Sequence, residues 1–183
     1  MTRDEALDLL HEWTRKDALR KHAYGVEAAM AAYARKFGED EEKWRVVGLL
    51  HDFDYERYPD AEDHPVRGSE VLREKSLPED MIRAILSHAS HTGVPRETLM
   101  AKTLFAVDEL VGFLTACALV RPDKKIASVQ FKSVRKKLKD KAFARAVNRD
   151  EIRDGAEDLG VELSEHVAFV VEAMAGISEE LGL

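Results

Sequence analysis

Apolar residues recur along this chain at spacings of three and four positions, the pattern of helices that bury one face. No segment shows the sustained alternation of apolar and polar residues that predicts a strand. The 5 prolines and 10 glycines lie mostly between the periodic segments and mark their ends. The pattern therefore predicts an all-α fold, a single compact bundle of helices.

Local start and stop signals set the expected helix boundaries. Thr2, followed three residues later by Glu5, predicts a capping box at the start of the first helix. Gly38 predicts the end of the second helix, and Pro65 and Pro78 suit first turns of later ones. After the first helix, the expected helices cover about residues 17–37, 40–50, 65–75, 78–90 or 92, 95–120, 148–159 and 164–181.

Length and cysteine content point to one ordinary intracellular domain. The 183 residues contain no low-complexity linker and no repeat, and they suffice to bury a substantial core. The single cysteine, Cys117, lies in an apolar run and has no partner for an internal disulfide. No apolar leader follows Met1, and no stretch is long and apolar enough for a membrane span. We expect a soluble cytoplasmic protein without a membrane partner. Nothing in the sequence indicates its oligomeric state.

The formal charge of −7 is unevenly distributed. Residues 121–149 carry a net charge of +9, which leaves −16 on the rest of the chain. This basic segment either attracts phosphate groups or forms a solvated helix face. Its only aromatic residues are Phe131 and Phe143, and the acidic remainder would repel a polyanion. We therefore expect a small phosphorylated molecule as partner and no nucleic acid polymer.

The residue pair His51-Asp52 is the first candidate for chemistry. It ends the apolar run of residues 46–50 and precedes an irregular stretch, 53–63. Helix neighbours point about 100° apart, so the two side chains converge on one ion only if it lies between their directions. Asp108 lies inside an apolar helix, where an ionised carboxylate needs a cation or several donors. His22, taken alone, is more typical of a hydrogen-bonded core residue.

Together these residues resemble the signature of the HD-domain superfamily of metal-dependent phosphohydrolases. The resemblance covers about residues 20–120 of a single domain, 1–183, and leaves 121–183 as a C-terminal helical extension. His64-Pro65 with Gly68, and His88 after Ile85-Leu86-Ser87, look like the additional histidines of the HDIG-type branch. Asp54 stands where many relatives carry glycine, so the subfamily remains open.

The resemblance implies a site for one or two divalent transition-metal ions. Iron or manganese is preferred, while zinc, cobalt and nickel also suit imidazole and carboxylate ligands. Asp52 is a plausible bridge, and His91 either contacts substrate or a second ion or caps its helix. The implied metal ligands are His22, His51, Asp52, His64, His88 and Asp108.

The expected reaction is hydrolysis of a nucleotide or another phosphoester by a metal-activated water. Asp54 and Glu56 follow the ligand pair and could act catalytically by positioning that water or transferring a proton; the alternative for both is an ordinary surface pair. Asp54 and Glu109 are also candidates for hydrogen-bond partners of liganding imidazoles. Resemblance to dinucleotide polyphosphate hydrolases suggests Lys102 and Arg121 as substrate-binding residues. The basic segment adds Lys132 to this group.

Two other functions remain compatible with the same residues. Some HD-domain proteins with six such ligands are mixed-valent di-iron oxygenases. A binding or regulatory module, with a structural metal or a sensed nucleotide, is the alternative outside enzymes. Among the aromatic residues after Asp52, Phe53, Tyr55 and Tyr58 either form a wall for a substrate ring or pack in the core.

Overall fold

The computed structural model describes all 183 residues and confirms the all-α prediction. It contains ten α-helices, two short 3-10 turns at Ser90–Thr92 and Ile126–Ser128, and no strand. The helices are α1 (Arg3–Trp13), α2 (Asp17–Phe37), α3 (Glu41–Leu50), α4 (Val66–Glu74), α5 (Glu79–His88), α6 (Leu99–Leu119), α7 (Phe131–Leu138), α8 (Arg149–Leu159), α9 (Leu163–Ala175) and α10 (Ser178–Leu181).

Local signals predicted most helix ends correctly. The capping box at Thr2 is formed, with both reciprocal hydrogen bonds to Glu5, and Gly38 ends α2 at a φ of 72°. The long apolar helix begins later than predicted, because the hydroxyl of Thr98 accepts the amide hydrogen of Ala101 and caps α6. The predicted last helix is divided at residues 176–177 into α9 and α10.

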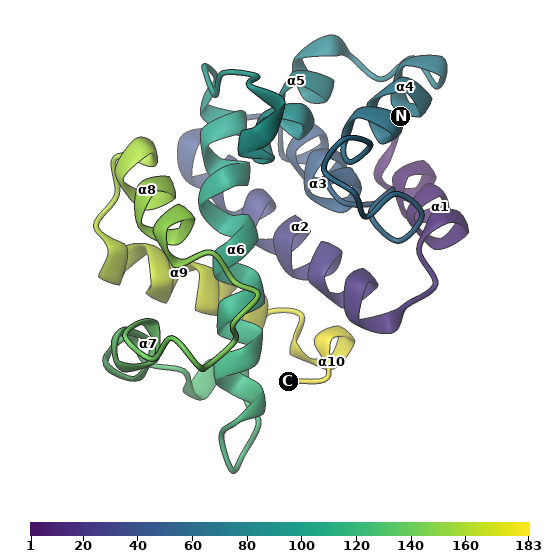
Figure 1. The fold of residues 1–183 in the computed structure, drawn as a ribbon. Coiled ribbons are helices and arrows are strands. Elements are labelled where there is room, and N and C mark those ends of the chain that lie inside the picture. The colour runs from purple at the N-terminus through teal and green to yellow at the C-terminus, as the bar shows by residue number, and fades with distance from the viewer.

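The two longest helices, α2 and α6, cross in the middle of the molecule (Figure 1). Helix α3 packs along α2, and α8 packs along α6. Both contacts depend on glycine, because a Cβ at Gly48 would lie 2.7 Å from Cα of Glu27, and one at Gly155 would lie 2.6 Å from Cα of Ala106. One continuous cluster of 41 buried apolar residues, including Cys117, holds the helices together.

The basic segment, predicted either to attract phosphate groups or to form a solvated helix face, contains a short helix, α7. Val134 and Leu138 point into the protein, whereas Lys132, Arg135 and Lys136 are exposed and form no ion pair. α7 therefore has one apolar face toward the core and one basic face toward solvent. None of the helices combines the length and apolar character that a membrane crossing requires.

Candidate metal centre

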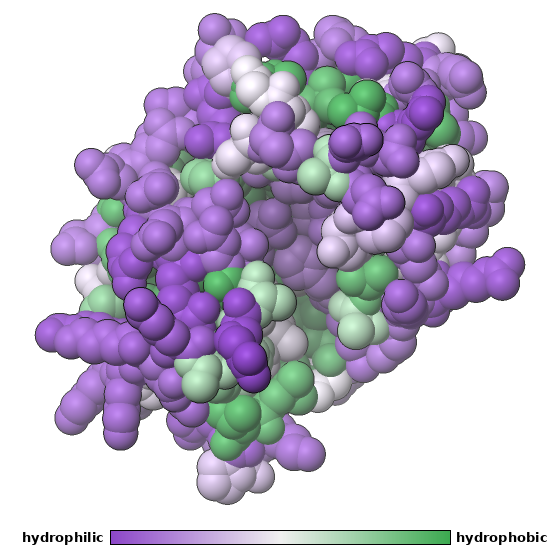
Figure 2. All heavy atoms as spheres, viewed as in Figure 1, coloured by the Kyte–Doolittle hydropathy of each residue, from purple (hydrophilic) through white to green (hydrophobic).

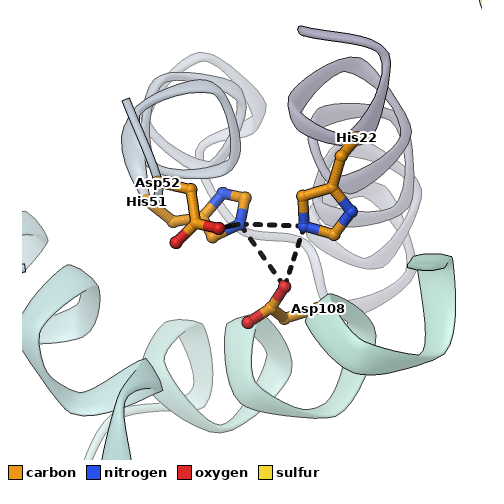
Figure 3. Close-up of side chains that lie close together, drawn as sticks. All are labelled: His22, His51, Asp52 and Asp108. Carbon is orange, nitrogen blue, oxygen red and sulfur yellow. Dashed lines mark hydrogen bonds and ion pairs between the residues drawn. The ribbon is translucent and has the colours of Figure 1, made fainter. Parts of the chain in front are cut away.

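Three helices bring four of the predicted ligands together (Figure 3). His22 lies on α2, Asp108 lies on α6, and His51 and Asp52 follow directly after α3. Nε2 of His22 lies 2.9 Å from Oδ1 of Asp108, and Nε2 of His51 lies 3.4 Å from the same oxygen. Oδ2 of Asp52 lies 3.7 Å from Nε2 of His51. These atoms surround one point, as the donors of a metal site do.

A second cluster joins Asp52 to two more histidines. Nε2 of His64, just before α4, lies 3.2 Å from Oδ1 of Asp52. Nε2 of His88, the last residue of α5, lies 3.2 Å from the same oxygen. The structure therefore places all six predicted ligands in two adjoining clusters that share Asp52, with one carboxylate oxygen facing each cluster.

Three of the predicted ligand histidines, His51, His64 and His88, are each oriented by a hydrogen bond from the Nδ1 side of the ring, which faces away from the clusters. Nδ1 of His51 donates to the carbonyl of Gly48 at 2.8 Å, and Nδ1 of His88 donates to that of Ile85 at 2.5 Å. Carbonyls in the last turn of a helix lack intrahelical partners, so this bond is available where α3 and α5 end. Since Nδ1 carries the hydrogen, the lone pair of Nε2 is free to face the cluster.

His64 is oriented by Asp54, a residue that was predicted to act catalytically. Oδ1 of Asp54 accepts the Nδ1 hydrogen of His64 at 2.8 Å, and Oδ2 accepts the backbone hydrogen of Gly68 at 2.8 Å. Asp54 is fully buried and does not line the cleft. Its position fits the other predicted role, that of a carboxylate supporting a ligand.

Glu56 also lies away from the ligands. Its Oε2 accepts the backbone hydrogens of Arg15 at 2.7 Å and Lys16 at 3.0 Å. These backbone hydrogen bonds lower the pKa of Glu56. The side chain thus ties the loop after α3 to the start of α2 and does not line the cleft, so its position does not support the catalytic role predicted for it.

The three predicted phosphate-binding residues are not brought to the ligands either. Lys102 forms an ion pair with Asp158 at 3.2 Å, and Arg121 pairs with Asp123 beyond the end of α6. Lys132 is exposed on α7. Arg121 follows Asp108 by 13 residues, which corresponds to roughly 20 Å along the axis of α6 at a rise of about 1.5 Å per residue. No lysine or arginine lines the cleft at the clusters.

The clusters open into a cleft of about 510 Å³. Besides five of the ligands, polar groups from three other segments reach it. His91 donates from Nε2 to the carbonyl of His64 at 2.8 Å, and the ring of Tyr55 meets that of His64 edge-on at 5.2 Å. The cleft is lined by His22, Asp52, Tyr55, His64, His88, Ala89, Ser90, His91, Asp108, Glu109, Gly112 and Glu151.

Two carboxylates at the cleft were not predicted to line it. Glu109 was expected only as a partner of an imidazole. Burial and the charge of Asp108 raise the pKa of Glu109 to about 7. Glu151 comes from α8, and no local pattern distinguishes it from other acidic residues of that helix. The available signal for Glu109 was the apolar character of its neighbours on α6, which indicates that this acidic residue lies close to the core.

Among the aromatic residues after Asp52, the structure separates the two predicted possibilities. Phe53 is buried in the core, and Tyr58 packs near the ring of Trp13 at 6.4 Å. Tyr55 lines the cleft and is 40% exposed. A wall of three rings is therefore not formed.

The electrostatics of the clusters favour a cation. Burial alone would raise the pKa of Asp108, but the neighbouring imidazoles of His51 and His22 hold it well below its usual range. Burial would likewise lower the pKa of His64, yet Asp52 and Asp54 raise it to about 9. The carboxylates therefore attract positive charge, which protonated imidazoles supply without an ion and which a bound cation would supply in their place.

One buried atom provides a direct test of whether the site suits a metal. Oδ1 of Asp52 is inaccessible to solvent and accepts no hydrogen bond of good geometry, although Nε2 of His64 and of His88 each lie 3.2 Å from it. A buried carboxylate oxygen is costly without a well-aligned partner, and a cation held by Asp52, His64 and His88 would supply one. The donor set of imidazoles and carboxylates suits divalent transition metals. The residues present therefore fit a metal centre.

Comparison with known proteins bears on the same segment. A model of the HD domain family matches residues 19–111, half of the chain. The chain belongs to the HD domain family. All six clustered residues, from His22 to Asp108, lie within the matched HD domain. Members of this family are generally metal-dependent hydrolases.

Among curated proteins, the chain is similar to ribonuclease Y of Oleidesulfovibrio alaskensis (strain ATCC BAA-1058 / DSM 17464 / G20). The two are 31% identical over 93 residues, which is 50% of this chain and 18% of that ribonuclease. The chain thus corresponds to less than a fifth of this relative's length. No solved structure gives a significant match.

Proposed function

We propose that this protein is a phosphohydrolase that uses two divalent metal ions, iron or manganese by preference, to hydrolyse a small phosphoester. The observation that carries the proposal is the position of Asp52. Its Oδ1 lies 3.2 Å from the Nε2 atoms of His64 and His88, while its Oδ2 faces His51. A carboxylate that serves two neighbouring sets of imidazoles is suited to hold two ions, as in the HDIG-type branch.

The charge of the cleft supports dependence on metal. Four carboxylates and no basic side chain except imidazoles line it, so the chain alone would repel a phosphate group. Metal ions, when bound, polarise phosphoryl oxygens and lower the pKa of a water molecule. The chain's own contribution is to orient the ligands, through Asp54 and the carbonyls of Gly48 and Ile85.

Proton transfer in this proposal uses carboxylates that are not ligands. Glu109 and Glu151 line the cleft beside the clusters and are the acidic groups placed to accept or hold a proton there. His91, fixed by its bond to the carbonyl of His64, is placed to contact the substrate. The buried Asp54 and the capping Glu56 take no part in this step.

Similarity to a ribonuclease supports chemistry at phosphorus. We keep a small substrate rather than a polymer, because no lysine or arginine lines the cleft, whereas a group of basic side chains lies on α7. Phosphate release from nucleotides and other phosphoesters is therefore the activity to screen.

Elemental analysis of protein purified without chelators tests the proposal. We expect about two metal equivalents in the wild type and fewer in Asp52→Ala and His88→Ala, because each substitution removes a predicted donor. His11→Ala is the matched control, since His11 bonds to the hydroxyl of Tyr24 and lies outside both clusters. One equivalent that His88→Ala retains would indicate a mononuclear site.

Turnover is then measured with each metal under anaerobic conditions. Release of phosphate that is lost in Asp52→Ala and kept in His11→Ala is the expected result. Absence of turnover with every metal and ester would overturn the proposed activity. Oxygen consumption that depends on iron and substrate would instead favour an HD-type oxygenase.

A further inference from the structure

A second hollow, of about 360 Å³, adjoins the metal cleft. It lies between the start of α2, the second half of α6 and the C-terminal residues, and it shares His22 and Gly112 with the cleft. Figure 2 shows a depression at the centre of this face, with hydrophilic residues in and around it and apolar residues gathered below it. Its lining consists of Asp17, Ala18, Lys21, His22, Gly112, Thr115, Leu119, Leu181, Gly182 and Leu183.

The two hollows differ in chemistry. Imidazoles and carboxylates line the metal cleft, whereas leucines from α6 and the C-terminal residues line the second hollow. Leu119 is 50% exposed, which is unusual for a large apolar side chain at a concave surface. Lys21 and Asp17, paired at 2.9 Å, form the polar part of the wall. An apolar pocket with a few polar groups is typical of a site for a small organic molecule.

Gly112 stands where the two hollows meet. A Cβ at this position would have no atom within 4 Å, so packing does not require glycine here. Glycine inside a helix lowers helix stability relative to alanine. Packing therefore does not account for the glycine at position 112, which leaves the common border of the two hollows free of a side chain.

The wall formed by Leu181 and Leu183 lies outside the segment that the family model matches. Gly182 allows this wall to approach α2, because it adopts a φ of 71° and a Cβ there would lie 3.3 Å from Nζ of Lys21. The second hollow is thus built from this chain's C-terminal residues on one side and from a metal-ligand helix on the other.

We propose that the second hollow, here called the ring pocket, binds the alcohol part of the substrate. The substrate class is then a phosphomonoester whose alcohol carries an apolar or aromatic ring. This inference rests on the proposed function, which places the phosphate at the clusters around Asp52. The ring passes Gly112 and packs against Leu119 and Leu181, while Lys21 and Asp17 offer a donor and an acceptor to its polar edge.

The ring pocket also holds the product of the reaction. In hydrolysis the oxygen of water forms a new bond to phosphorus, and the ester P–O bond breaks. The ester oxygen leaves with the electron pair of that bond and takes up the proton that the attacking water gives up. The ring-bearing alcohol is therefore released on the side of Gly112, and inorganic phosphate is released at the clusters.

Hydrolysis of two esters tests the proposal, 1-naphthyl phosphate with a ring and glycerol 2-phosphate without one. Thr115→Leu adds bulk inside the ring pocket, and Leu119→Asp places a charge in it; neither residue lines the metal cleft. We expect each to lower kcat/KM for the naphthyl ester by about tenfold or more, and to leave that for the glycerol ester within about twofold. Val120→Asp is the matched control, because Val120 is 58% exposed and does not line the pocket.

A binding measurement that needs no turnover completes the test. 1-Naphthol is added to metal-free protein, and the NMR signals of the Gly112 and Gly182 amides are followed. We expect both signals to shift in the wild type and in Val120→Asp, and to stay in place in Leu119→Asp. If the amide signals shift in this way but no ester is hydrolysed, the proposed function is refuted and the ring pocket remains as a binding site. A different result would overturn the ring pocket and leave the proposed function standing. In that case both esters are hydrolysed, Leu119→Asp changes kcat/KM equally for both, and naphthol shifts neither amide signal.

Discussion

Nδ1 of His64 donates to Oδ1 of Asp54 over 2.8 Å, and this bond turns Nε2 of His64 toward Asp52. Asp54 is in turn held by the backbone hydrogen of Gly68. Asp54, two positions after Asp52 in the sequence, therefore supports the site through His64 and does not face the cleft. Its effect on metal binding passes through the orientation of one imidazole.

Asp54→Asn is accordingly expected to weaken metal binding while the protein stays folded. The amide keeps the shape of the side chain but loses the charge that favours the Nδ1–H form of His64. A loss of about 10- to 100-fold in metal affinity is typical for such partners. Competition with a chelator of known affinity measures it. Asp63→Asn, which removes only an exposed partner of Arg67, should bind metal as the wild type does.

Substitution of Gly68 should disturb the same support by crowding it. A Cβ at Gly68 would lie 2.7 Å from Cγ of Asp54 and 3.0 Å from the ring of Phe53. We expect Gly68→Ala to lower the free energy of unfolding by about 1–3 kcal/mol, because both neighbours are buried. Urea unfolding of the metal-free protein measures the change.

Gly112→Ala provides the contrasting case. A methyl group at this position meets no atom within 4 Å, and alanine favours the helix more than glycine does. We expect the free energy of unfolding to rise by about 0.5–1 kcal/mol. A fall of similar size to that of Gly68→Ala would show that Gly112 is needed for packing.

The stability of the fold should depend on pH through His166. This buried imidazole accepts from the hydroxyl of Tyr33 at 2.6 Å and donates to the carbonyl of Ala106 at 2.9 Å. Burial lowers its pKa below the ordinary value of 6.5. The unfolded chain therefore binds a proton near pH 6.5 that the native protein does not bind, and stability falls as the pH drops below that value.

His166→Gln should remove this contribution. We expect the variant to be less stable than the wild type at pH 7, because it loses fitted hydrogen bonds. The difference between the two proteins should narrow from pH 7 to pH 5. Urea unfolding at three pH values between these limits tests it, and a constant difference would show that His166 does not titrate differently on unfolding.

Lys102→Ala separates the two roles that this residue has been given. Sequence position suggested phosphate binding, whereas the structure pairs Lys102 with Asp158 outside the cleft. We expect an unchanged KM for a phosphoester and a stability loss below about 1 kcal/mol, as for other partly exposed ion pairs. A clearly raised KM with intact metal content would return Lys102 to the substrate site.

The sequence predicted the helices well, because capping and periodicity are local. Thr2, Gly38 and the apolar spacing act within one or two turns, so their effects can be read from neighbouring residues. The six clustered residues could be proposed through family resemblance, since their order along the chain is a recognisable pattern. Distances between α2, α3, α5 and α6 did not have to be known for that.

Residue roles that depend on distant partners could not be predicted in this way. Glu56 accepts hydrogen bonds from backbone amides about 40 positions earlier, and Lys102 forms an ion pair with a carboxylate 56 positions later. Glu151 reaches the cleft only because α8 packs on α6 through Gly155. Such contacts are set by the packing of whole helices, and no pattern near the residue reports them.

Asp52 belongs to both clusters, so two ions bound there would share one carboxylate. Binding at one cluster would then change the affinity of the other, and this effect would be reciprocal. A titration should show two linked binding steps. His88→Ala should alter the affinity at His22, His51 and Asp108, although His88 belongs to the other cluster.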